Sequence, residues 1–126
     1  MFQLDNLSSV PIYEQLIRKI KENIMKGYLN PGDHLPSVRK MARELNVTPN
    51  TVQKAYSMLE QERVIMTVRG KGAFVADKKP EIDNRQKLEE LKREIKPLIM
   101  ELLYSGVEKS DIINMIEEFF EEIKER

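Results

Sequence analysis

The chain has 126 residues, of which 40% are apolar and 33% charged, a composition typical of one small globular domain with an appendage. The absence of cysteine excludes disulfide scaffolds, thiolate zinc sites and cysteine nucleophiles, and the single histidine excludes a multi-histidine metal site. The zero net charge combines +4 over residues 34–76 (7 basic, 3 acidic) with −4 over residues 77–126 (10 basic, 14 acidic), which indicates different partners for the two regions.

The first predicted helix begins near Pro11 and ends at Gly27. Pro11 suits a first helical turn, because its missing N–H would have no partner there, and Gly27 can adopt the left-handed conformation that ends a helix. Residues 28–33 form a predicted turn. The apolar face of the helix recurs at helical spacing, as Ile12, Leu16, Ile17, Ile20 and Ile24.

Two short helices are predicted next, over about residues 38–45 and 49–61. Ser37 and Thr48 are suitable N-cap residues for them, and Asn46 can end the first helix. Two short helices joined by a tight turn, the second with a small polar N-terminus, are typical of a helix-turn-helix.

A β-hairpin is predicted after the second short helix. Residues 64–68 and 73–76 are β-prone runs, and Arg69-Gly70-Lys71-Gly72 separates them. A helix-turn-helix followed by a basic hairpin is the winged-helix arrangement. A purely structural turn is the alternative for the hairpin tip. A nucleotide phosphate loop fits less well, because the GxxxxGK[ST] spacing is absent and no helix follows.

The remainder of the chain is predicted to be a linker, residues 77–83, and a helical region, residues 84–126. The first tail helix covers about 84–104, and its internal Pro97 should kink it or divide it near Arg93. Two amphipathic helices cannot cover both of their apolar faces alone, so we expect a homodimer through this region. The expected dimerisation residues are Leu88, Leu91, Ile95, Leu98 and Leu102, with Ile112, Ile116, Phe119, Phe120 and Ile123.

These motifs together resemble the N-terminal domain of GntR-family transcription regulators over residues 10–76, and the short helical tail resembles the YtrA-like subfamily. The family usually has Gly at the position of Arg63, so either Arg63 adopts a left-handed backbone or the wing is re-aimed. The matching segments are Pro11-Ile12-Tyr13 with Gln15, Gly27, Pro31-Gly32-Asp33, Leu35-Pro36-Ser37-Val38-Arg39, residues 47–52, Lys54-Ala55-Tyr56 and residues 69–75.

The resemblance implies a fold that is mainly α (α+β), with a winged helix-turn-helix in residues 1–76, a two-stranded β wing and a dimerising helix pair. It also implies that Arg39 contacts DNA, by forking onto guanine or phosphate, whereas the alternative is a surface arginine. The expected DNA-binding residues are Arg39, Arg43, Thr48, Asn50, Thr51, Gln53, Lys54, Arg69, Gly70 and Lys71. Of these, Thr48 can be a simple N-cap, Lys54 favours phosphate, and Arg43 can bind phosphate or pair with a nearby Glu.

We therefore expect a cytoplasmic, homodimeric, sequence-specific transcription regulator, most simply a repressor of an inverted-repeat operator. By resemblance its targets include its own operon and transporter genes. The alternative is a helical interaction module whose winged helix contacts protein. An enzyme is not expected, since no nucleophile–base pair or metal set is present. We expect no cofactor, no membrane partner and no secretory signal, and the residues specify no small-molecule effector. His34 is interpreted as structural or exposed, and the acidic face of the last helix as solvated surface.

Overall fold

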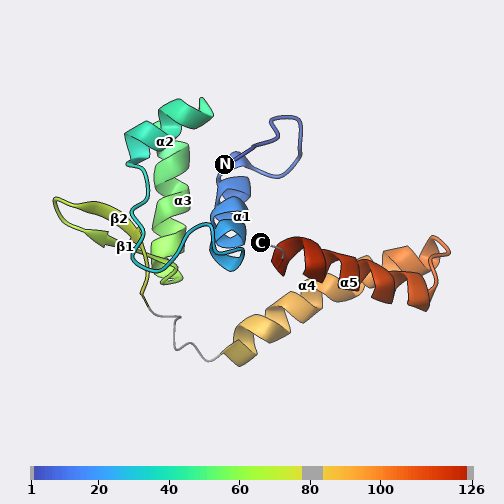
Figure 1. The fold of residues 1–126 in the computed structure, drawn as a ribbon. Coiled ribbons are helices and arrows are strands. Elements are labelled where there is room, and N and C mark those ends of the chain that lie inside the picture. The colour runs from blue at the N-terminus through green and yellow to red at the C-terminus, as the bar shows by residue number, and fades with distance from the viewer. Residues whose placement is uncertain (1, 78–83, 125–126) are drawn as a thin grey trace. The chain divides into compact units, whose positions relative to one another are not determined.

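The computed structural model describes residues 2–77 and 84–124 of the chain. They form two compact units, one with three helices and a β-hairpin and one with two helices (Figure 1). The fold is mainly α with a small antiparallel sheet, as predicted, and residues 78–83 of the expected linker lie outside the described residues. In chain order the elements are α1 (Ile12–Met25), α2 (Val38–Leu45), α3 (Pro49–Gln61), β1 (Ile65–Val68), β2 (Gly72–Val75), α4 (Asn84–Tyr104) and α5 (Lys109–Lys124).

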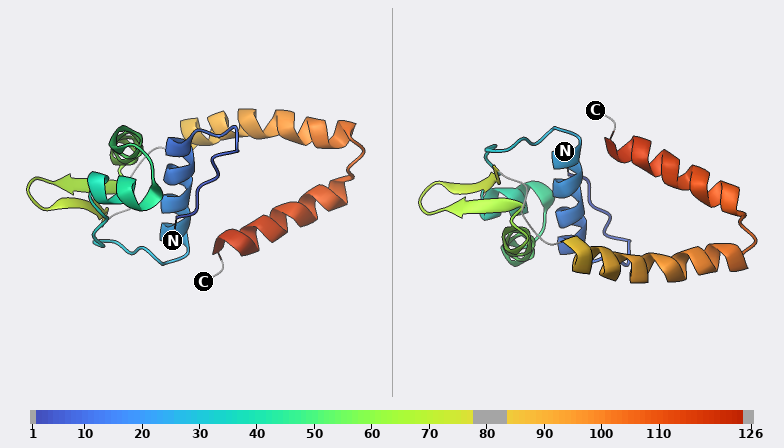
Figure 2. Two further views of the ribbon diagram at one scale, coloured as in Figure 1. Left: turned by 90° about the horizontal axis from the view of Figure 1, so that it is seen from above. Right: turned by 90° about the horizontal axis from the view of Figure 1, so that it is seen from below.

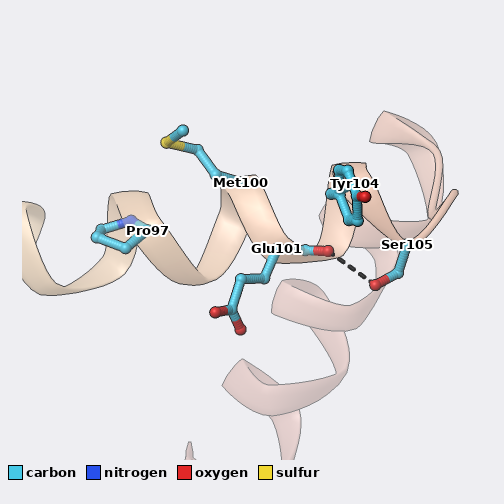
Figure 3. A pocket seen from close by; sticks show the side chains of 5 residues that line it. All are labelled: Pro97, Met100, Glu101, Tyr104 and Ser105. Atoms are coloured by element: carbon cyan, nitrogen blue, oxygen red, sulfur yellow. Dashed lines mark hydrogen bonds between the residues drawn. The ribbon is translucent and has the colours of Figure 1, made fainter.

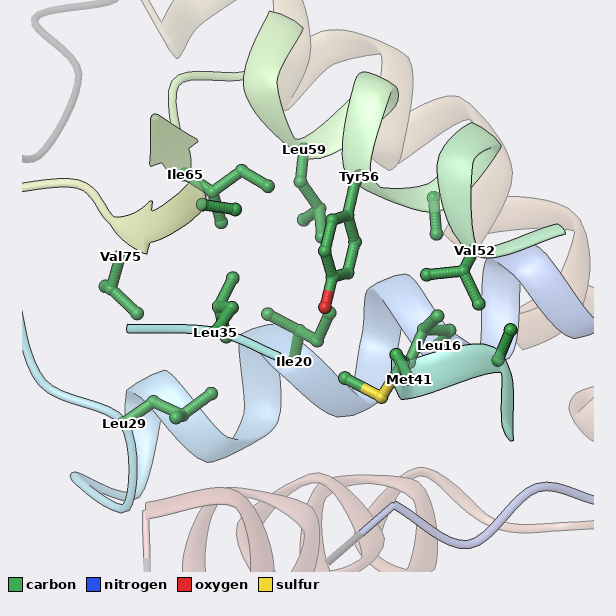
Figure 4. Packing of buried hydrophobic residues seen from close by; sticks show 13 residues of the cluster. Leu16, Ile20, Leu29, Leu35, Met41, Val52, Tyr56, Leu59, Ile65 and Val75 are labelled. Carbon is green, nitrogen blue, oxygen red and sulfur yellow. The ribbon is translucent and has the colours of Figure 1, made fainter. Parts of the chain in front are cut away.

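The core of the first unit lies among α1, α2, α3 and the hairpin (Figure 4). Leu16 and Ile20 of α1 and Val52 and Leu59 of α3 have no exposed surface. Their spacings of four and seven residues place them on one stripe of each helix. Burying each such side chain contributes about 1.5–3 kcal/mol, so these stripes fix how the helices pack. The remaining core members are Leu29, Leu35, Met41, Ala42, Ala55, Tyr56, Ile65, Ala73 and Val75.

Local capping defines the helix-turn-helix. The Ser37 hydroxyl accepts a hydrogen bond from the backbone N–H of Lys40 at 3.1 Å, and the Thr48 hydroxyl accepts one from Thr51 at 3.4 Å. Asn46 ends α2 in the left-handed conformation, with φ of 56°. The predicted bounds of both helices are therefore confirmed, because each end is set by residues adjacent to it.

The hairpin is anchored to the segment that precedes α2. Within the hairpin, Ile65 pairs with Val75 in an antiparallel register. The backbone N–H of Gly32 donates to the Val75 carbonyl at 2.9 Å, and that of Leu35 donates to the Ala73 carbonyl at 2.8 Å. The segment over residues 32–35 therefore pairs with the free edge of β2 and orients the hairpin relative to the helices.

The connection from α3 to β1 passes through Arg63. Its φ is 61°, so this arginine adopts the left-handed backbone that glycine favours. The Arg63 N–H donates to the Glu60 carbonyl, and the Val64 N–H donates to the Leu59 carbonyl, both at 2.9 Å. Of the two possibilities that the sequence left open, Arg63 accepts the strained conformation and the helix ends in an ordinary left-handed turn. The conformation costs on the order of 1 kcal/mol.

Helix α4 is continuous from Asn84 to Tyr104, with Pro97 inside it. The predicted possibility that the helix divides near Arg93 is therefore wrong. Arg93 and Pro97 are both exposed, so water can hydrogen-bond the carbonyl that lacks the Pro97 N–H as a partner. Among the described residues, none of the helices is long and apolar enough to cross a bilayer.

Helices α4 and α5 meet at the connection around Gly106 and diverge away from it (Figure 2). Helix α5 begins at Lys109, with Asp111 in its first turn. Ile112 is 6% exposed and is the one buried side chain among the described residues of these two helices. The contact near the connection thus leaves most of both apolar faces uncovered.

Candidate nucleic-acid interface

Two arginines lie one turn apart on the exposed side of α2. Arg39 is the second residue of the helix and Arg43 follows four residues later, so both lie on one face. Both are exposed, and with Pro49 they border an open depression of about 400 Å³. Within residues 2–77 and 84–124 neither guanidinium forms an ion pair. Both can therefore bind phosphate or a guanine edge without first breaking a salt bridge.

The first turn of α3 presents small polar groups to solvent. Thr48, Asn50 and Gln53 are exposed and Thr51 is half-buried. The two threonine hydroxyls lie 2.9 Å apart, and the Gln53 amide donates to the Ser57 hydroxyl at 3.1 Å. Thr48 is thus the N-cap that the sequence allowed. The exposed side of the turn is the one that a recognition helix places against base edges and phosphates.

Lys54 lies over an aromatic ring of α1. Its ammonium nitrogen is 3.9 Å from the centre of the Tyr13 ring. Tyr13 is half-buried against the core, so the ring is a fixed platform, and its hydroxyl donates to Glu14 Oε1 at 3.2 Å. The attraction between a cation and a ring face holds Lys54 at the side of α3. The sequence favoured a phosphate contact for Lys54 but did not indicate Tyr13 as its neighbour, because no local spacing relates residues on different helices.

The wing tip carries two exposed cations on a narrow turn. Arg69, Gly70 and Lys71 join β1 to β2, and the Lys71 N–H donates to the Val68 carbonyl at 2.9 Å. Gly70 has φ of 79°, which the turn requires. The tip extends away from α2 and α3 in every view (Figures 1 and 2). A protruding turn of this kind can reach a groove or the phosphates beside the recognition helix.

His34 lies beside the wing. Its ring is exposed, and its Nε2 is 2.9 Å from the backbone oxygen of Lys71. The interpretation of this histidine as structural or exposed agrees with both observations. The link to the wing was missed, because nothing in the local sequence around His34 points to Lys71. Within the part of the chain that the structure describes, no group of three His, Cys, Asp or Glu side chains is arranged to hold a metal ion.

The predicted dimerisation residues are mostly exposed in the single chain. Ile112 is buried and Leu102 is half-buried, where α4 and α5 meet. The other eight are between 39% exposed, at Ile123, and 64% exposed, at Phe120. Uncovered apolar faces of this extent typically mark an interaction surface. The exposed members are Leu88, Leu91, Ile95, Leu98, Ile116, Phe119, Phe120 and Ile123.

A depression of about 530 Å³ lies on another side of α4 and is lined by Pro97, Met100, Glu101, Tyr104 and Ser105 (Figure 3). The Ser105 hydroxyl donates to the Glu101 backbone oxygen at 2.9 Å, which closes the end of the helix. Tyr104 is 95% exposed. Because one helix and the turn after it supply every lining residue, the depression lacks the enclosing walls of a usual small-molecule pocket.

A helix-turn-helix with an exposed polar start to its second helix, followed by a basic hairpin, is how winged-helix proteins meet a duplex. The first unit is a DNA-binding domain of this class. The model of the bacterial regulatory proteins of the gntR family matches residues 12–75. The chain belongs to the GntR family and is a DNA-binding transcription regulator. Proteins of this family are transcriptional regulators rather than enzymes.

Individual relatives extend the likeness over both units. The chain is 41% identical to the HTH-type transcriptional repressor YtrA of Bacillus subtilis, over 98% of this chain and 95% of that protein. A solved structure named as a transcriptional antiterminator from Listeria monocytogenes is 40% identical, with a TM-score of 0.93 over 100% of this chain and 94% of that one. The DNA-binding domain of AraR, solved in complex with the operator ORE1, is 26% identical with a TM-score of 0.52, over 60% of this chain and 93% of that one.

Proposed function

We propose that the protein is a cytoplasmic, homodimeric repressor that binds an inverted-repeat operator. The observation that carries the proposal is the 41% identity to the repressor YtrA, which runs through the tail helices as well as the winged domain. The role as repressor rather than activator rests on that relative. The solved AraR domain in complex with an operator supports the use of the winged domain for a specific DNA site.

The proposed contacts divide between base edges and phosphates. The start of α3 enters the major groove, where the amides of Asn50 and Gln53 read base edges. Arg39 forks onto guanine or phosphate, and Arg69 enters the minor groove beside the site. The other proposed DNA-binding residues, Arg43, Thr48, Thr51, Lys54, Gly70 and Lys71, contact the sugar–phosphate backbone. Among the residues that the structure describes, none of the five cations of this set forms an ion pair with an acidic side chain, which favours phosphate binding.

The exposed apolar faces of α4 and α5 support the proposed dimer. Packing them against the same faces of a second copy removes them from water, at about 25 cal/mol per Å² of apolar surface. A twofold dimer presents two recognition helices to half-sites about one helical turn, or roughly 34 Å, apart. The proposed operator is therefore an inverted repeat. The regulated genes include the protein's own operon and neighbouring transporter genes, which transcript levels in a deletion strain would test.

The decisive experiment is selection of duplex DNA from a random pool by the purified protein at about 150 mM salt. We expect enrichment of an inverted repeat with half-sites about one turn apart. Affinity for the selected site should fall about 10³–10⁵-fold between 50 and 200 mM salt if 6–10 phosphates are contacted. Folded protein that enriches no motif would overturn the proposal.

Matched arginine variants localise the interface. Arg39→Ala removes a proposed contact and should weaken binding about 10- to 100-fold, the cost of a good bidentate contact. Arg18→Ala is the control, because Arg18 is exposed on α1, two residues from both Leu16 and Ile20 of the core stripe and hence on the far side of that helix. Equal affinities for the two variants would remove α2 from the proposed interface.

A further inference from the structure

We infer that His34 is a positioning residue for the wing, which holds the backbone of Lys71 and so determines where Arg69 and Lys71 meet DNA. The inference rests on the proposed function, because it assumes that the wing contacts the operator. His34 lies outside the wing, in the segment that leads into α2. It therefore links the position of the wing tip to the body of the domain.

A side-chain hydrogen bond makes the first part of this link. His34 Nε2 is 2.9 Å from the backbone oxygen of Lys71. A carbonyl oxygen only accepts, so Nε2 must carry the proton and donate. The Lys71 N–H is bonded to the Val68 carbonyl at 2.9 Å. The peptide groups on both sides of Lys71 are thus tied, one within the hairpin and one to the domain.

The His34 ring is itself held in place against β2. Its centroid lies 4.7 Å from that of Phe74, with the two rings tilted by 56°. The backbones of these two residues form an isolated antiparallel bridge. On either side, Leu35 donates to Ala73 at 2.8 Å and Val75 donates to Asp33 at 2.9 Å. A ring with a fixed backbone and a tilted aromatic neighbour has little freedom to leave its hydrogen bond.

Gly72 provides the space that the ring occupies. Its φ is 101°, and a Cβ built on it would stand 2.8 Å from His34 Nε2. That separation is closer than non-bonded atoms tolerate, so a side chain at Gly72 would displace the ring from Lys71. Because Gly72 has no side chain, the His34 ring has room to reach the Lys71 backbone.

The contact between His34 and the Lys71 backbone matters because the wing is small. Two strands of four residues each form a hairpin that is only marginally ordered by itself. A tip that moves in the free protein must be ordered on binding, which reduces affinity. By holding Lys71 before DNA arrives, His34 lowers that cost and presents the two cations at one place.

The test is a set of double-mutant cycles on affinity for the selected operator. His34→Ala should weaken binding about 3- to 10-fold, the range of one lost hydrogen bond with its packing. His34→Gln, which keeps a donor at similar reach, should restore most of the loss. In the Arg69→Ala/Lys71→Ala background, His34→Ala should change affinity less than about 2-fold, because the groups it positions are gone.

The background of Arg39→Ala is the matched control. There the His34→Ala loss should persist in full, since the two contacts are independent. If His34→Ala reduces operator affinity equally in the Arg69→Ala/Lys71→Ala background, His34 supports the domain as a whole. That result would overturn the inference. No loss from His34→Ala in the wild-type background would also overturn it. If the wing variant and Arg39→Ala themselves bind normally, it is the proposed function that fails.

Discussion

The hydroxyl of Tyr56 on α3 donates a 2.7 Å hydrogen bond to the backbone carbonyl of Pro36. Pro36 precedes the cap residue of α2, so this bond joins the two helices of the helix-turn-helix close to Arg39. Tyr56 is 5% exposed. Burial raises the pKa of Tyr56 well above its ordinary value, and the negative charge of Glu44 raises it further. The hydroxyl therefore remains a donor throughout the neutral range.

Tyr56→Phe should destabilise the domain by about 1–3 kcal/mol, because the Pro36 carbonyl loses its partner. The variant should also change the dependence on pH. The pKa of Tyr56 is higher in the folded state than the value near 10 of the unfolded state. Its contribution is therefore complete below about pH 10 and declines as the pH rises toward the folded pKa.

Denaturant unfolding between pH 7 and 11 checks this prediction. The wild type should lose stability more steeply above pH 10 than Tyr56→Phe does. Tyr28→Phe is the control, because Tyr28 is 56% exposed in the same unit, and it should keep the wild-type slope. Parallel curves for wild type and Tyr56→Phe would contradict the role assigned to burial of this hydroxyl.

The stacking of Lys54 on Tyr13 leads to a second prediction, about DNA affinity. Tyr13→Leu removes the ring and should weaken operator binding about 2- to 5-fold, the size of an exposed cation–π interaction. Tyr13→Phe keeps the ring and should bind nearly as wild type. Lys54→Ala should reduce the slope of log affinity against log salt by about 0.9, for one lost phosphate contact.

Fluorescence anisotropy over a range of salt concentrations measures both affinity and slope. The informative comparison is Leu against Phe at residue 13, because both fill the half-buried site but only Phe presents a π face. Equal affinities for those two variants would show that Tyr13 contributes packing alone. An unchanged salt slope for Lys54→Ala would show that this ammonium does not contact a phosphate.

The helix-turn-helix was predictable because its determinants are local. Ser37, Asn46 and Thr48 act on backbone groups within a few residues, so the sequence shows both the helices and their ends. The contacts of Lys54 and His34 were not predictable, because each joins segments that only the folded backbone brings together. The sequence was sufficient to place the predicted DNA-binding residues on their helices and on the wing. It was not sufficient to identify the groups that orient their side chains.

The error at Pro97 has a different origin. The rule that proline breaks a helix holds when the freed carbonyl is buried or the ring clashes with packed neighbours. Pro97 is exposed, and so is Arg93, whose carbonyl would accept the missing hydrogen bond. Because both residues are exposed, water can hydrogen-bond that carbonyl, and the apolar positions continue on both sides of the proline. Whether a helix continues through a proline therefore depends on the burial of the freed carbonyl, which the sequence does not show.

Arg63 provides a prediction about stability. Arg63→Gly should stabilise the domain by about 0.5–1 kcal/mol, because glycine adopts φ of 61° without the strain that a Cβ causes. The greater flexibility of glycine in the unfolded state offsets part of this gain. Gln61→Gly is the control, because Gln61 is exposed at the last position of α3, where a helical backbone gives glycine no advantage, so that variant should be destabilised. Thermal unfolding of the two variants checks the prediction, and destabilisation by Arg63→Gly would show that the arginine side chain offsets its strain.

The proposed dimer is tested by two residues of equal exposure on opposite sides of α4. Leu98 is 61% exposed and Met100 is 60% exposed, and positions two apart on a helix differ by about 200°. Leu98 belongs to the proposed dimer surface, whereas Met100 lines the depression on the other side. Leu98→Glu should give monomers, because it places a charge in an apolar interface, and Met100→Glu should remain dimeric.

Sedimentation velocity at micromolar concentrations distinguishes the two variants, and DNA binding then connects the dimer to the operator. Monomeric Leu98→Glu should lose most of its affinity for the full inverted repeat while its weak affinity for a single half-site is unchanged, since the winged domain is intact. Dimers of both variants would exclude the Leu98 face as the interface. Dissociation by Met100→Glu alone would move the interface to the opposite side of α4, and the half-site spacing would then have to be derived from that arrangement.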